Sequence, residues 1–152
     1  MTRLKIVVEG QTEEAFVNQV LAPHLRAYEM HTTPIVLGGG GSFGKALRTI
    51  RVTLSSDPGA YCSTMFDYYG LPPDYPGLNA EDCPPAARLA DRIDFLEARL
   101  AEKVGAPYRF LPYLPLHEFE ALLFADVEEI DRALRLSSAQ ESRLDELRAI
   151  VE

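Results

Sequence analysis

The fold class is indicated most clearly by the stretch LKIVVEGQTEE, residues 4–14. Its apolar run, residues 4–8, stops at Glu9 and Gly10, which predicts a buried strand followed by a turn. Thr12 is suited to cap a helix that starts there. Apolar residues then recur at helical spacing and predict one buried helix face: Phe16, Val17, Val20, Leu21 and Leu25.

The same alternation of strand and helix continues along the chain. Further strands are predicted at 34–37, 61–66 and 108–114, and helices at 45–54, 89–104 and after Asp126 and Ser138. Residues 69–85 are rich in proline and glycine and predict a long loop of the kind that often carries function. Pro112 suits a sheet edge or the end of a strand better than the centre of a sheet. We therefore predict one α/β domain over residues 1–152, with a mostly parallel four-stranded sheet and helices on both faces.

Composition narrows the class of protein. A chain of 152 residues that is 47% hydrophobic suits one domain with one packed core. The N-terminal apolar run is too short for a signal peptide or membrane span, so we expect a soluble cytoplasmic protein without a membrane partner. Cys62 and Cys83 have no metal-binding or disulfide spacing and are expected to be reduced thiols. At a net charge of −8, any nucleic-acid contact must be local, metal-bridged or supplied by a partner.

Carboxylates follow several predicted strands. Glu9 follows the first strand and Asp67 the third, while Glu118 and Glu120 follow the fourth. In parallel sheets ligands bind outside the carboxyl ends of the strands, and carboxylate oxygens are preferred Mg²⁺ ligands. The structural alternatives are a solvated turn glutamate at Glu9, and a turn former or helix cap at Asp67.

The segment HEFEALLF, residues 117–124, carries the remaining candidates. Glu118 and Glu120 would share one side of a strand but diverge on a helix, where only one of them would reach a cleft. His117 is a candidate base, metal ligand or hydrogen-bonding brace. A structural role is the more frequent one for a lone histidine.

A glycine-rich loop also resembles a nucleotide-binding motif. GGGSFGKA, residues 39–46, fits GxxxxGK between a strand and a helix, but Ala46 stands where Ser or Thr would bind Mg²⁺. Nucleotide hydrolysis is therefore disfavoured. A milder prediction is that Lys45 and the backbone N–H groups of Gly40 and Gly41 hold a phosphate of the substrate. The simplest alternative is a flexible loop.

Three of these motifs together resemble a known family. VVEGQTE, residues 7–13, resembles the opening motif of TOPRIM (topoisomerase–primase) domains. FDYYGLP, residues 66–72, and LHEFEALLF, residues 116–124, resemble a bacterial domain-of-unknown-function family, DUF4276, that is classed as TOPRIM-like. The resemblance spans about residues 3–135 and implies a Rossmann-like TOPRIM fold.

The resemblance also implies site roles. Glu9 would be the general acid/base or metal-site glutamate, and Asp67 the first acid of the DxD motif. Tyr69 replaces the second acid of that motif, so Glu118 or Glu120 is expected to supply the missing ligand. Family members continue beyond this point with a segment rich in Pro, Ser and Lys, which predicts that a C-terminal segment is absent here.

Two functions are consistent with these features. The first is a nuclease or related phosphoryl-transfer domain that uses Mg²⁺ or Mn²⁺ on DNA or RNA, with an AAA-type ATPase partner and a role in phage defence by analogy. The second is a catalytically degenerate TOPRIM-fold interaction subunit. The missing DxD acid and the net acidity favour the second function.

Overall fold

The structure, a computed structural model, describes residues 1–38 and 42–116. Four strands form one all-parallel sheet in the order β2-β1-β3-β4. Their bounds are Thr2–Val8 for β1, Met30–Val36 for β2, Ala60–Met65 for β3 and Phe110–Leu111 for β4. The predicted α/β fold and strand count are confirmed.

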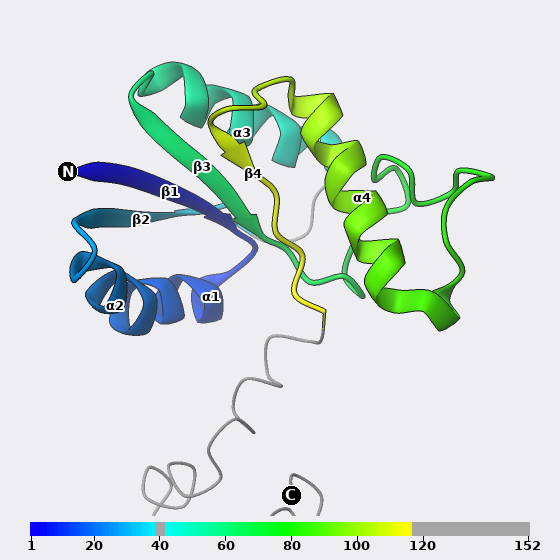
Figure 1. Ribbon diagram of the computed structural model, residues 1–152, viewed down its shortest axis with the longest axis horizontal. Coiled ribbons are helices and arrows are strands. Elements are labelled where there is room, and N and C mark those ends of the chain that lie inside the picture. The colour runs from blue at the N-terminus through cyan, green and yellow to red at the C-terminus, as the bar shows by residue number, and fades with distance from the viewer. Residues whose placement is uncertain (39–41, 117–152) are drawn as a thin grey trace, which may run out of the picture. The chain divides into compact units, whose positions relative to one another are not determined.

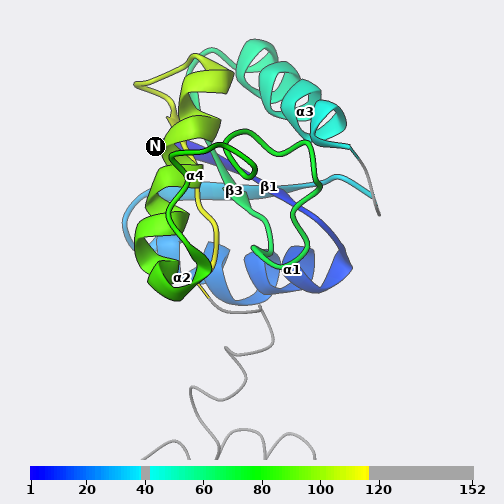
Figure 2. The same ribbon diagram turned by 90° about the vertical axis from the view of Figure 1, so that its right-hand side faces the viewer.

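Helices cover both faces of the sheet, as predicted. On one face lie α1 (Gln11–Phe16), the π-helical segment η1 (Val17–Leu21) and α2 (Ala22–Arg26). On the opposite face lie α3 (Phe43–Ser56) and α4 (Leu89–Val104), the latter preceded by the short 3₁₀ helix η2 (Ala86–Arg88). Figures 1 and 2 show the two helix layers with the sheet between them.

The strand β1 is central because it pairs with both β2 and β3. Its residues Ile6, Val7 and Val8 are buried, as an apolar run between two helix layers requires. Val8 is paired with Val36 on one side and Met65 on the other, so three strands end level. The residues immediately after them therefore leave the sheet side by side at its carboxyl edge.

The main core lies between the sheet and the layer of α3 and α4. The predicted apolar stripe of α4 is confirmed, because Ile93, Leu96, Leu100 and Val104 are all buried. Gly105 ends this helix in the left-handed conformation, with a φ of 74°. On the same face of the sheet, the helix α3 buries other apolar side chains in this cluster: Phe43, Ala46, Ile50 and Leu54.

The helical stretch after β1 differs from the prediction in two ways. Gly10, not Thr12, is the N-cap, and its N–H donates to Glu13 Oε2 at 3.0 Å. Val20, predicted on the buried face, is 54% exposed. Pro23 has no N–H for a regular helical bond, and nearby the Ala22 N–H bonds to Val17 O, five residues back. The wider π turn shifts the side chains, so an α-helical period misplaces Val20.

The edge strand β4 is shorter than predicted. It has two residues because Pro112, which has no N–H for the ladder, follows directly. Its edge position is confirmed. Both cysteines are free, and burial raises the pKa of the Cys62 thiol to about 12, which keeps it protonated. In the part of the chain that the structure describes, no helix is long and apolar enough to cross a membrane.

Candidate functional site

Two of the predicted acids meet at the carboxyl edge of the sheet. Glu9 directly follows β1, and Asp67 lies two residues beyond the end of β3. Partial burial raises the pKa of Glu9, and the negative charges of Asp67 and then Glu13 raise it further. A hydrogen bond to the backbone of Asp67 offsets part of this rise. The level strand ends thus bring Glu9 and Asp67 close enough for their charges to interact.

A tight turn fixes Asp67. The Tyr69 N–H donates to Asp67 Oδ1 at 3.0 Å, and the Gly70 N–H donates to the Asp67 carbonyl at 3.1 Å. The turn-former alternative for Asp67 is therefore also present, and it orients the carboxylate. A methyl group at Gly70 would lie 3.6 Å from Glu9 Oε2. Glycine at this position keeps the space beside the Glu9 carboxylate open.

Tyr69 lies two residues after Asp67, where the resemblance to TOPRIM domains predicts a second acid. Its side chain is 62% exposed and packs edge-to-face against Tyr68, with ring centroids 5.0 Å apart. Its contribution to the acidic pair is its backbone N–H, which any residue except proline would supply.

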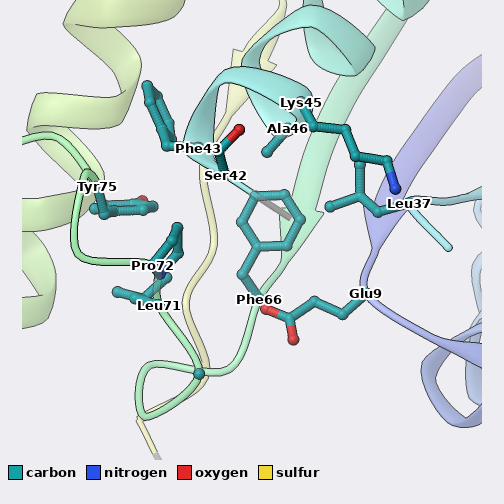
Figure 3. A pocket seen from close by; sticks show the side chains of 11 residues that line it. Glu9, Leu37, Ser42, Phe43, Lys45, Ala46, Phe66, Leu71, Pro72 and Tyr75 are labelled. Atoms are coloured by element: carbon teal, nitrogen blue, oxygen red, sulfur yellow. The ribbon is translucent and has the colours of Figure 1, made fainter. Parts of the chain in front are cut away.

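A pocket of about 90 Å³ lies beside Glu9. Figure 3 shows Glu9, Leu37 and Lys45 on one side of it and Leu71 and Tyr75 on the other. The remaining lining residues are Ser42, Phe43, Ala46, Phe66, Gly70 and Pro72. Glu9, Leu37 and Phe66 line it together because each directly follows one of the three strands that end level. The pocket is therefore a product of strand register.

The start of α3 lies at the same pocket. Lys45, predicted to bind phosphate, lines the pocket, and its Nζ donates to the Gly38 carbonyl at 3.1 Å. The first helical N–H, that of Phe43, donates to Asp74 Oδ1 at 3.1 Å. A carboxylate from the loop thus takes the place that an anion would occupy at this helix N-terminus. Gly40 and Gly41 lie outside the described residues.

Comparison with protein-family models identifies the family of this chain. A family model described as Domain of unknown function (DUF4276) matches residues 8–152. The chain belongs to the DUF4276 family. Neither the curated proteins nor the solved structures include a match to it. The DUF4276 match includes both Glu9 and Asp67 as well as the segment 117–124.

The acids of this DUF4276 chain suit one hard divalent cation. Mg²⁺ is usually bound through one or two carboxylates, with water and substrate phosphate completing its shell. Glu9 and Asp67 provide two carboxylates, and a cation would relieve the repulsion between them. Within residues 1–38 and 42–116, no group of three or more His, Cys, Asp or Glu residues is arranged to hold a metal. His117, Glu118 and Glu120 lie outside those ranges.

The predicted long loop of the DUF4276 chain is a fixed wall of the pocket. Tyr75 is 4% exposed and packs edge-to-face on Phe43, with centroids 5.5 Å apart. The Arg92 guanidinium donates to the Leu78 and Pro84 carbonyls at 3.2 and 2.6 Å. The Tyr75 hydroxyl is buried without a hydrogen-bond partner in the described part of the chain. Burial, and then the nearby charge of Glu97, raise its pKa, so it stays protonated. Sequence reasoning missed Asp74 and Tyr75.

Proposed function

We propose that this DUF4276 protein is a TOPRIM-type, Mg²⁺-dependent nuclease or related phosphoryl-transfer domain that acts on nucleic acid in the cytoplasm. The observation that supports this most is the pairing of Glu9 with Asp67 at the carboxyl edge of an all-parallel sheet. Two like charges held close together are typical of a site built for a cation. Mn²⁺ would serve in place of Mg²⁺.

The two acids have different roles in this proposal. Glu9 is partly buried and has a raised pKa, which suits it to take a proton from the attacking water. Asp67 is held by the Tyr69 N–H and serves as the fixed metal ligand. When bound, Mg²⁺ supplies the positive charge that polarises the scissile phosphate. Glu118 and Glu120 are proposed as metal ligands, and His117 as an acid or base. These roles rest on the sequence alone.

Other parts of the proposal depend on resemblance and on the pocket. Lys45 carries a positive charge at the pocket and would meet a substrate phosphate after leaving the Gly38 carbonyl, with Gly40 and Gly41 adding backbone N–H groups. An AAA-type ATPase partner and a role in phage defence follow by analogy with TOPRIM nucleases.

A cleavage assay on the full chain tests the proposal. The protein is incubated with Mg²⁺ or Mn²⁺ and with plasmid, single-stranded DNA or RNA. We expect cleavage of at least one substrate that stops when EDTA is added. A Glu9→Gln preparation, purified in parallel, separates this activity from a contaminating nuclease. Absence of cleavage with both metals on all three substrates would contradict the nuclease function.

A catalytically inactive interaction subunit is the second candidate function. One observation favours it: the Asp74 carboxylate already accepts the Phe43 N–H, so it places negative charge where a substrate phosphate would approach α3. The presence of Tyr69 in place of an acid also favours an inactive subunit. An inactive subunit would leave nucleic acid intact with either metal, so the cleavage assay separates the two functions.

A further inference from the structure

Metal binding does not explain which side chains line the pocket beside Glu9. Its walls are mainly apolar, and three aromatic rings line it, those of Phe43, Phe66 and Tyr75. Two of these rings, Phe43 and Tyr75, are fixed edge-to-face by their contact with each other. A site that only held a cation and a phosphate would have no use for an apolar cavity of about 90 Å³ next to its carboxylates.

The polar groups of the pocket are few and differ in chemistry. Glu9 contributes a carboxylate that accepts hydrogen bonds, Lys45 an ammonium group that donates them, and Ser42 a hydroxyl that does both. In Figure 3, Glu9 and Lys45 lie on the side of the cavity opposite the loop residues Leu71 and Tyr75. A ligand that fills this space needs an apolar body with a polar edge.

We propose that this pocket holds one unpaired nucleobase of a single-stranded nucleic acid, next to the phosphate that the acidic pair acts on. This inference rests on the proposed function for the position of the phosphate. A nucleobase has apolar faces for the aromatic and aliphatic walls and a hydrogen-bonding edge for the Ser42 hydroxyl. A base within a duplex is stacked on both faces and cannot enter such a cavity. The pocket therefore selects single strands, or strands whose base has been extruded.

Ala46 allows the pocket to be filled without touching the acids. It is buried on α3 and lines the cavity, so Ala46→Met places a flexible apolar side chain inside it. Val52→Met is the matched control, because Val52 lies on the same helix and is 57% exposed. Both variants add a methionine to α3, and only one adds it to the pocket.

Binding is measured by fluorescence anisotropy on the full chain in Ca²⁺, which occupies oxygen sites without supporting cleavage. The probes are a labelled single strand, as DNA and as RNA, the same backbone lacking all bases, and the matching duplex. We expect the base-bearing strand to bind about tenfold or more tightly than the abasic one. The duplex should bind no better than the abasic strand. Ala46→Met should bring the two single-stranded probes close to equal affinity, while Val52→Met keeps the preference.

The possible outcomes separate this inference from the proposed function. Metal-dependent cleavage with equal affinity for abasic and base-bearing strands would overturn the base pocket and leave the nuclease function intact. A base preference that Ala46→Met abolishes, without cleavage by any metal, would support the pocket and contradict the nuclease. Failure of wild type to bind either strand would overturn the base pocket, whatever the cleavage assay shows. The wild-type comparison needs no variant, so a folding defect in Ala46→Met cannot hide the result.

Discussion

Replacing Glu9 with glutamine is expected to lower metal-dependent cleavage by roughly 100- to 10,000-fold, the range for loss of a general acid–base group. The same change should leave the melting temperature at pH 7 unchanged or higher. The folded-state pKa of Glu9 is raised, so its stabilising contribution is present below the unfolded pKa and is lost as pH rises through the folded pKa. At neutral pH the ionised carboxylate opposes folding, and glutamine removes that charge while keeping the shape.

Activity and thermal melting are measured on the same preparation of each variant. Asp67→Asn should behave like Glu9→Gln, because asparagine keeps an oxygen for the Tyr69 N–H and removes the repulsion on Glu9. Glu14→Gln, in the first turn of α1, is the control for loss of one charge and should retain activity. Normal activity with a lowered melting temperature in both Glu9→Gln and Asp67→Asn would mean that the acids are structural residues.

Gly77→Ala is expected to have the largest effect on stability, about 2–5 kcal/mol of unfolding free energy. Gly77 has a φ of 83°, and a methyl group there would lie 2.7 Å from Arg99 Cγ and 2.9 Å from Phe95 Cε1. Backbone strain and steric overlap therefore add. Because α4 carries both of these side chains, the substitution would push the pocket loop away from this helix.

Gly105→Ala separates the two causes. Gly105 has a similar φ of 74°, but a methyl group there has no neighbour within 4 Å. Chemical denaturation of both variants should show Gly105→Ala losing only about 1–2 kcal/mol, the contribution of strain alone. Equal losses in the two variants would contradict close packing of the loop on α4.

Much of the fold could be predicted from local patterns. The apolar run before Glu9 predicted a buried strand, and the spacing of apolar residues in α4 predicted a helix. Both predictions work because the geometry of a strand or a helix fixes how often its side chains return to the same face. The exposure of Val20 could not be predicted this way, since the π turn beside Pro23 changes the period within one helical stretch. The two-residue length of β4 likewise depends on Pro112 and on where pairing with β3 stops.

The closeness of Glu9 and Asp67 could be predicted from the sequence, but the shape of the pocket beside them could not. Glu9 and Asp67 were expected to lie together because each follows an apolar strand, and parallel strands share a carboxyl edge. The pocket depends on three strands ending level, which is a property of pairing and has no local sequence signal. Asp74 caps a helix that begins 31 residues earlier in the chain, and Tyr75 is buried by tertiary packing. Such long-range contacts cannot be read from turn composition.

The most direct test of the Glu9–Asp67 site is an NMR titration of the Glu9 side-chain carboxyl group, with and without saturating Mg²⁺. Without metal, we predict a pKa above the ordinary value of 4.5, because burial and the Asp67 charge disfavour the ionised form. Bound Mg²⁺ should lower that pKa, since a cation favours the carboxylate. Asp67→Asn should lower the metal-free pKa and weaken the response to Mg²⁺. A Glu9 pKa at the ordinary value that Mg²⁺ does not change would contradict the proposed cation site.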